Sequence, residues 1–275
     1  MTGMTIPELE EMARKCRVEI CKMTHRAQAG HPGGSLSEID ILCGLYGHRL
    51  RAKPANPDWE DRDRFILSKG HASPGMYAVL AEMGFITHKD LESYRVKGGV
   101  CQGHVDMKWC PGVDFSAGSL GMGLSFGMGC AVAANLDGSK RNAYVMVGDG
   151  EIQEGSVWEA AMAAAHHELG NLKLFVDCHR IQNDDFCEAQ MRMFDIPAKW
   201  KSFGWAVKEI DGHDMKSIVD AIDWMDTVND KPAVVIANTV KGKGVSFMED
   251  NPAFHGAAPS DEQLAIALSE LGVSS

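Results

Sequence analysis

Apolar residues recur in two rhythms along this 275-residue chain. Positions 9, 12, 16, 20 and 23 are apolar, which is the spacing of one helix face and predicts a helix from about Pro7 to Ala27. Thr5 and Glu8 have the form of a capping box at its start. Similar patterns predict helices over residues 73–83, 154–167 and 215–228, one opening at Ser35, a short one after residue 87, and a last one after residue 260.

The second rhythm consists of short, continuously apolar runs, which are typical of strands buried on both faces. They cover residues 65–67, 143–147, 172–176 and 233–238, and the less regular stretch 205–210 is expected to form a further strand. Strands of this kind, separated by helices, predict an α/β fold in which a mostly parallel sheet carries helices on both faces. We find no internal repeat or linker, so we expect a single domain over residues 1–275. The glycine-rich, polar stretch 96–119 predicts a long functional loop.

Composition narrows the class of protein. Hydrophobic residues make up 45% and charged residues 24% of the chain, as in ordinary globular proteins. The net charge of −11 argues against nucleic-acid binding, which needs a basic face. No apolar run approaches the roughly 20 residues that cross a membrane, and no signal-peptide layout is present. Eight scattered cysteines without a CxxC pair favour reduced thiols, so we expect a cytoplasmic protein.

The most informative motif is Gly148-Asp149-Gly150, which ends a buried strand shortly before a predicted helix. The glycines allow close backbone approach to a phosphate, and a helix N-terminus presents free N–H groups to it. An aspartate would repel that phosphate unless a divalent cation such as Mg²⁺ bridged the two. Taken alone, the motif fits equally well with a strand-to-helix turn in which Asp149 caps the helix.

A second strand end follows about thirty residues later, with the sequence DCHRI at 177–181. This arrangement resembles the thiamine diphosphate motif, in which an aspartate, an asparagine and a backbone carbonyl hold Mg²⁺. Asp149 and Ile181 match the first and last ligands, whereas His179 stands where asparagine is usual. Imidazole suits Mn²⁺, Co²⁺, Fe²⁺ or Zn²⁺ better than Mg²⁺, so our hypothesis is that His179 shifts the metal preference.

Further segments resemble transketolases. AGHPGGS at 29–35, DRFILSKGHA at 63–72, GH at 103–104 and FHG at 254–256 match four histidine-bearing segments of that family. GSLGMG at 118–123 resembles the segment whose backbone lies against the aminopyrimidine ring, and QEGSVWEA at 153–160 resembles the helix after GDG. The resemblance runs from about residue 8 to 272, and it identifies the chain as similar to an N-terminal transketolase subunit.

The resemblance implies a role for each histidine. His71 would contact the diphosphate and thiazolium, and His104 the first hydroxyls of the donor sugar. His31 and His255 would serve proton transfer near the third carbon, which suits a side chain that titrates near neutral pH. The implied cofactor-binding residues are His71, Gly118, Ser119, Leu120, Gly148, Asp149, Gly150, Glu154, His179 and Lys243. The remaining candidates, His166, His167 and His213, are interpreted as ordinary surface or core histidines.

The implied reaction is thiamine diphosphate-dependent transfer of a two-carbon ketol unit from a ketose to an aldose. Xylulose 5-phosphate with ribose 5-phosphate is the default pair, and a branched or sulfonated sugar fits the residues equally well. No pattern for the family's pyrimidine-binding domain is recognisable, so the resemblance implies a partner chain that carries it. Glu154 would face the activating carboxylate of that partner. The expected assembly is a heterotetramer of two copies of each chain.

Two alternatives stay open. The chain could be the α-type subunit of another thiamine diphosphate enzyme, such as a 2-oxo acid dehydrogenase, but the GHPGG, SKGHA and GSLGMG set is not expected there. It could instead be a non-catalytic domain that binds cofactor or a partner. His179 favours that interpretation, and the four retained histidines argue against it.

Overall fold

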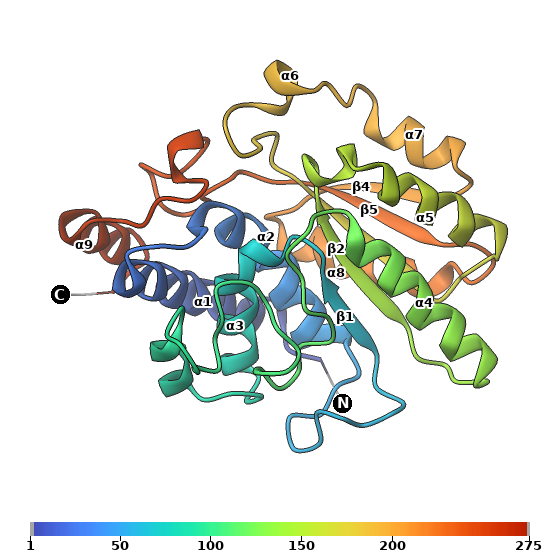
Figure 1. Cartoon of the computed structure of the whole chain (residues 1–275), viewed down its shortest axis with the longest axis horizontal. Coiled ribbons are helices and arrows are strands. Elements are labelled where there is room, and N and C mark those ends of the chain that lie inside the picture. The colour runs from blue at the N-terminus through green and yellow to red at the C-terminus, as the bar shows by residue number, and fades with distance from the viewer. Residues whose placement is uncertain (1–2, 274–275) are drawn as a thin grey trace.

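The computed structural model describes residues 3–273, so the ends of the predicted domain, residues 1–2 and 274–275, lie outside it. Its centre is a five-stranded sheet in the order β1-β2-β3-β5-β4, and every neighbouring pair is parallel (Figure 1). The strands are β1 (Arg64–Leu67), β2 (Ala143–Gly148), β3 (Leu172–Cys178), β4 (Ala206–Asp211) and β5 (Ala233–Asn238). The predicted parallel α/β fold is therefore confirmed.

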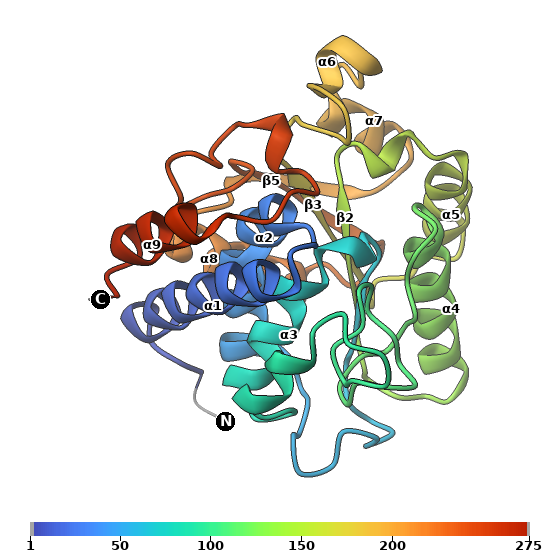
Figure 2. The ribbon, with the colours of Figure 1, turned by 60° about the vertical axis from the view of Figure 1, so that its left-hand side comes forward.

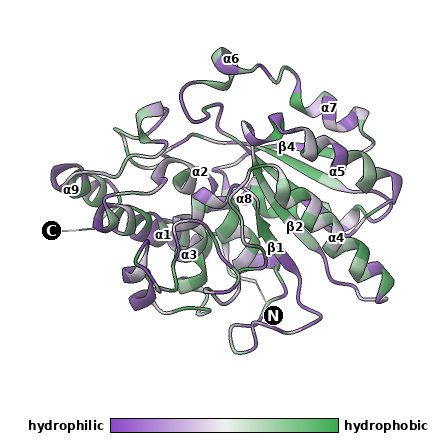
Figure 3. Cartoon of the chain, viewed as in Figure 1, coloured by the Kyte–Doolittle hydropathy of each residue, from purple (hydrophilic) through white to green (hydrophobic). Residues whose placement is uncertain are grey.

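Helices cover both faces of the sheet (Figures 1 and 2). One layer contains α1 (Ile6–Ala27), α2 (Pro32–Gly44), α3 (Ser73–Glu82) and α8 (Met215–Thr227), and α9 (Asp261–Glu270) packs on α1. The other contains α4 (Met122–Leu136), α5 (Gly155–His166) and α7 (Ile196–Ser202). Consecutive residues of β3 alternate between the layers: Phe175 joins the first core, and Leu174 and Val176 join the second. The strands carry the green of apolar residues in Figure 3.

The sequence signals for helix starts were correct for α1, α9 and the short helix after residue 87, and wrong for α2. Capping boxes formed by Thr5 and Ser260 precede α1 and α9, and Thr87 caps a 3₁₀ helix over His88–Ser93. Helix α2 begins at Pro32 rather than at the predicted Ser35, because proline at the first turn has its φ already set. The Ser35 hydroxyl instead donates to the carbonyl of His31 at 2.9 Å.

Three of the α-helices in residues 3–273 were not predicted: α4, α7 and the short α6 (Cys187–Gln190). Glycines obscured α4, and the structure explains two of them by close packing. A Cβ on Gly123 would lie 2.4 Å from the Ser68 side chain, and one on Gly127 would lie 2.3 Å from Val145. The glycines therefore let α4 lie directly on the sheet.

The arrangement gathers loops at the carboxyl edge of the sheet, where ligands bind in open α/β folds. Segments 68–72, 149–154, 179–186 and 239–244 follow β1, β2, β3 and β5 at this edge. The predicted loop 96–119 contains no helix or strand. Within residues 3–273, no helix is both long enough and apolar enough to cross a membrane.

Candidate active site

The structure brings the four predicted histidines together at the carboxyl edge. The ring centroid of His31 lies 5.0 Å from that of His71, 5.4 Å from that of His255 and 6.3 Å from that of His104. The His71 and His255 centroids are also 5.4 Å apart. These residues come from four separate segments of the chain, so the fold creates one histidine cluster from them.

Local structure positions each ring. His31 immediately precedes α2, and His71 lies in the 3₁₀ turn Gly70–Ala72 after β1. That turn needs glycine at position 70, because a Cβ there would lie 2.5 Å from the Cβ of Ala117. The hydroxyl of Tyr77 donates to the carbonyl of His104 at 3.1 Å and so holds the long loop against α3.

Burial keeps these imidazoles neutral. Together with the charge of Arg95, it lowers the pKa of His31 to about 4. Burial and the charge of Lys241 lower the pKa of His255 to about 3. Burial also lowers the pKa of His104, and that of His71 well below its usual range. At neutral pH each ring can therefore accept a proton as well as donate one.

His31 also carries an orphaned polar atom. Its Nδ1 is buried and has no hydrogen-bond partner within the described part of the chain. Buried polar atoms are nearly always paired in folded proteins, so an unpaired one needs an explanation. A hydroxyl of a bound ligand would satisfy this nitrogen.

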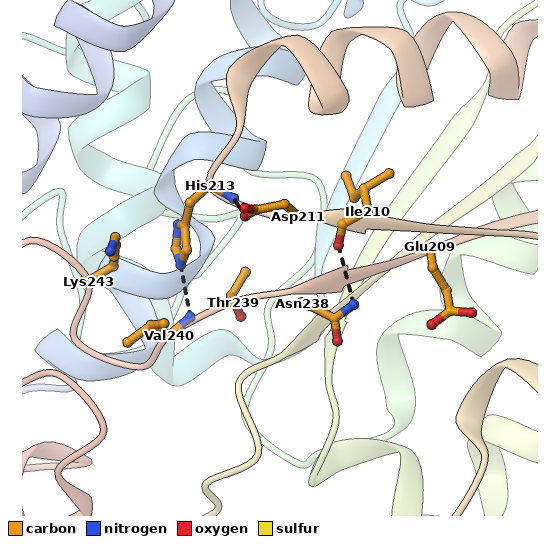
Figure 4. Close-up of a pocket in the computed structure, with 8 residues that line it drawn as sticks. All are labelled: Glu209, Ile210, Asp211, His213, Asn238, Thr239, Val240 and Lys243. Carbon is orange, nitrogen blue, oxygen red and sulfur yellow. Dashed lines mark hydrogen bonds between the residues drawn. The ribbon is translucent and has the colours of Figure 1, made fainter.

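Lys241 joins the cluster, although the sequence pattern had pointed to Lys243. The Lys241 ammonium is buried, contacts Nδ1 of His255 at 2.6 Å and donates to the carbonyl of Ile181 at 2.9 Å. Lys243 instead pairs with Glu249 at 3.5 Å and lines another cavity with His213 (Figure 4). Gly242, with φ of 82°, turns the chain between the two lysines, and the pattern KGKG gave no basis for choosing between them.

A cluster of buried ionisable residues lies next to the histidines. The ammonium of Lys69, in the SKGHA motif, lies 2.6 Å from Asp177 and 2.9 Å from Glu38. Asp177 also accepts hydrogen bonds from the hydroxyls of Ser37 and Thr239. Although burial raises the pKa of Asp177, the charge of Lys69 dominates and holds it well below its usual range. Sequence reasoning missed both carboxylates: Asp177 begins the DCHRI segment, in which only His179 and Ile181 were given roles, and Glu38 lies inside a helix and outside the quoted motifs.

The GDG turn has the donor atoms expected for a divalent cation. Asp149 is almost fully buried and accepts backbone N–H groups from Gly150, at 2.9 Å, and from Arg180. The Nδ1 of His179 lies 3.6 Å from the carboxylate of Asp149 and accepts the N–H of Ile181 at 3.3 Å. Burial lowers the pKa of His179 to about 3, so the ring is neutral, as a metal ligand must be.

This donor set is small. No group of three or more His, Cys, Asp or Glu side chains that could hold a metal occurs among residues 3–273. The third predicted ligand, the carbonyl of Ile181, already accepts a hydrogen bond from Lys241. A cation here would rest on Asp149, His179 and that carbonyl, and would draw its remaining oxygen ligands from water or from a diphosphate.

Glu151 connects the GDG turn to the segment 118–123. Its buried carboxylate accepts the N–H groups of Gly121 at 2.8 Å and Gly148 at 3.0 Å, and the hydroxyl of Ser68. In the segment that it holds, Gly118 and Ser119 are exposed and Leu120 is half-buried. A Cβ on Gly118 would meet nothing within 4 Å. Glu154 is exposed beside Gly121, so this part of the site faces outward.

Comparisons with known proteins agree with this geometry. Residues 9–275 match the family described as "Transketolase, thiamine diphosphate binding domain". A subunit of the apulose-4-phosphate transketolase of Actinobacillus succinogenes is 39% identical, covering 98% of each chain. A 6-deoxy-6-sulfo-D-fructose transketolase subunit of a Clostridium strain is 37% identical, covering 96% of each chain.

Longer relatives match over part of their length. Human transketolase is 34% identical over 90% of this chain and 39% of its own. The crystal structure of transketolase from Campylobacter jejuni superposes with a TM-score of 0.91 at 32% identity, covering 98% of this chain and 43% of its own. The fold and the site thus define a thiamine diphosphate-binding domain. The chain belongs to the transketolase family, as an N-terminal transketolase subunit that acts in ketol transfer.

The neutral histidines predict how stability depends on pH. The pKa of His255 is about 3 in the folded protein and about 6.5 in an unfolded chain. The unfolded state therefore binds a proton that the folded state does not, and stability falls as pH drops below about 6.5. We expect His255→Gln to make the decrease in unfolding free energy between pH 6.5 and 4.5 shallower.

Chemical denaturation of both proteins across this pH range measures that slope. Asp149, whose pKa burial raises to about 6, opposes the trend, but its contribution is common to both proteins and cancels in the comparison. Equal slopes would show that His255 is not held neutral by the fold.

Proposed function

We propose that residues 1–275 form a single diphosphate-binding domain that contributes half of the active site of a two-chain transketolase. The observation that carries this proposal is the meeting of four neutral imidazoles from four segments beside the GDG turn. Cleavage of a ketose between its second and third carbons needs a group that takes the proton of the third hydroxyl. It also needs hydrogen-bond donors to the hydroxyls and carbonyl of the sugar.

The residues present fit thiamine diphosphate, which when bound would supply the electron sink for the ketol unit. Gly148 and Gly150 flank Asp149 at the end of β2, where bare backbone allows a diphosphate close approach. The backbone of 118–120 faces outward beside this turn and would border the pyrimidine ring. His71, in the turn after β1, would contact the diphosphate from the other side.

His31 and His255 divide the proton handling. Because Lys241 donates to Nδ1 of His255, the proton of this imidazole is placed on Nε2 and can be donated to a sugar oxygen. In the tautomer with its proton on Nε2, the unpaired Nδ1 of His31 would take the proton of the third hydroxyl. His104 would hold the first hydroxyls of the donor from the long loop.

His31→Ala should lower kcat of ketol transfer about 100-fold, which is the lower end of what a positioned acid–base group contributes. The measurement is steady-state turnover of the complex with its partner, at saturating thiamine diphosphate and Mg²⁺. His88→Ala is the matched control, because His88 is exposed, 58% in its side chain, and contacts Glu82 away from the histidine cluster. An unchanged kcat in His31→Ala would exclude this histidine from the chemistry.

We further propose that Asp149, His179 and the carbonyl of Ile181 hold a divalent cation, Mg²⁺ or a metal that accepts nitrogen more readily. The buried carboxylate supplies the charge, and Nδ1 of the neutral His179, 3.6 Å from that carboxylate, would give up the N–H of Ile181 to bind the cation. Mn²⁺ and Co²⁺ accept such a donor better than Mg²⁺ does.

His179→Asn should therefore change which metal supports the tightest binding of thiamine diphosphate. In the wild type, thiamine diphosphate should bind more tightly with Mn²⁺ or Co²⁺ than with Mg²⁺. In the variant the ratio should move toward Mg²⁺ by about tenfold, the scale of single changes around a metal. Calorimetric titration with each metal measures the ratio directly. The same ranking in both proteins would mean that His179 does not face the metal.

A partner chain is proposed because one face of the structure is apolar and uncovered. Helix α4 contains no charged residue and exposes Met122 by 47%, Phe126 by 38% and Leu136 by 83%. These side chains share one stripe with the small residues Gly129 and Ala133. Figures 1 and 2 show α4 beside α5 on the outer side of the sheet, and Figure 3 shows its apolar colouring. Monomeric proteins seldom leave such a stripe in water.

Helix α4 begins directly after segment 118–121, so a chain that covered it would also border the cofactor site. Two relatives of this length are named as subunits, whereas human transketolase is longer, with this chain covering 39% of it. We infer that the occupant of the α4 stripe is a chain with the pyrimidine-binding domain, assembled as two copies of each. A cytoplasmic location and a place in pentose phosphate metabolism remain predictions.

Phe126→Lys should weaken this association by at least about tenfold, because a charge would enter the middle of an apolar interface. The matched control is Ile266→Lys on α9, which replaces an apolar residue that is 49% exposed on another side of the molecule. Sedimentation velocity of each variant with the partner chain gives the affinities. Equal affinities of Phe126→Lys and wild type would place the interface elsewhere.

The identity of the sugars is the least constrained part of the proposal. The names of two relatives refer to apulose 4-phosphate and 6-deoxy-6-sulfo-D-fructose. These sugars should therefore be assayed as ketol donors or products beside xylulose 5-phosphate.

A further inference from the structure

The cavity at the ends of β4 and β5 contains a histidine with two well-defined hydrogen bonds. His213 lies between β4 and α8, and it lines this cavity of about 600 Å³ together with Thr239, Val240 and Lys243 (Figure 4). Its Nδ1 is 2.8 Å from a carboxylate oxygen of Asp40, and its Nε2 accepts the backbone N–H of Val240 at 2.8 Å. Both ring nitrogens are therefore engaged.

These bonds fix the tautomer of the ring. A backbone N–H can only donate, so Nε2 of His213 must be unprotonated, and the ring proton lies on Nδ1 facing Asp40. Asp40 is able to accept it: although burial raises the pKa of Asp40, the charge of Arg17 and hydrogen bonds from His213 and Arg17 bring it below its usual range. Arg17 donates to both oxygens of this carboxylate.

The same network holds the chain on both sides of Lys241. His213 binds the N–H of Val240, and the Nε of Arg17 donates to the carbonyl of Lys243 at 3.1 Å. Lys241 lies between these anchors, with its ammonium on His255 and on the carbonyl of Ile181. A shift of the backbone at Val240 would thus be passed directly to a buried cation in the histidine cluster.

We propose that His213 is a positioning residue: its Nδ1–H tautomer, set by Asp40 and Arg17, fixes the backbone at Val240 and thereby the placement of Lys241 against His255. This role revises the interpretation of His213 as an ordinary core histidine. The consequence for turnover rests on the proposed function, whereas the consequence for the protonation pattern of His255 does not.

Two amide substitutions separate the two bonds of the ring. Glutamine places its amide near Nε2 of the original imidazole, so His213→Gln can still accept the N–H of Val240. Asparagine places its amide near Nδ1, so His213→Asn can still donate to Asp40 but cannot reach Val240. If His213 only fills space or holds Asp40, His213→Asn should be tolerated. If it positions Val240, as proposed, His213→Gln should be tolerated and His213→Asn should not.

The experiment combines long-range ¹H–¹⁵N imidazole spectra of the chain with kinetics of the complex. In the wild type, we expect His213 to carry its proton on Nδ1 and His255 on Nε2. His213→Asn should alter the ring signals of His255 and lower kcat/KM about tenfold, the scale of one buried hydrogen bond. His213→Gln should preserve both, with kcat/KM within about threefold of the wild type.

A wild-type His213 with its proton on Nε2 would overturn the proposal, and this measurement needs no variant to fold. An His213→Asn protein with unchanged His255 signals would overturn it as well. If the complex shows no ketol transfer at all, the proposed function fails, but the spectra still decide whether His213 positions Lys241 and His255.

Discussion

The carboxylate of Asp177, at the end of β3, is the point on which the site depends. It accepts hydrogen bonds from Lys69 after β1, Ser37 in α2 and Thr239 after β5, so one buried anion joins segments that are far apart in the sequence. A buried carboxylate is costly unless it is paired and fully hydrogen-bonded, and removal of one partner of such a pair costs about 3–5 kcal/mol. The site can therefore form only when the segments after β1 and β5 and helix α2 have packed correctly around this carboxylate.

Above this charge cluster, burial determines the chemistry. Several imidazoles lie close to each other and to the buried ammonium of Lys241, so protonation of any of them is disfavoured. The result is a set of neutral donors and acceptors whose protons are assigned by their partners. Lys241 sets the proton of His255, and Asp40 sets that of His213. Because these tautomers are fixed, the ring nitrogens that donate and those that accept are determined before any ligand binds.

The sequence was sufficient for features that depend on local rules. Buried strands, the capping box at Thr5, and the GDG turn were all recognisable because their signals lie within a few residues. Helix α4 was missed because of its glycines. They are there so that the helix can pack closely on Ser68 and Val145, and such a long-range contact leaves no local sequence pattern. Lys241 was missed for a similar reason, since the turn at Gly242 decides which lysine of KGKG enters the site.

The most direct test of the account is the rate of ketol transfer by the purified chain, alone and with a purified partner that carries a pyrimidine-binding domain. The donors would be xylulose 5-phosphate, apulose 4-phosphate and 6-deoxy-6-sulfo-D-fructose, with thiamine diphosphate and Mg²⁺ or Mn²⁺ present. The account predicts no turnover by the chain alone and turnover of at least one donor by the mixture. Turnover by the chain alone, or a stable complex that transfers none of the three, would contradict the two-chain active site.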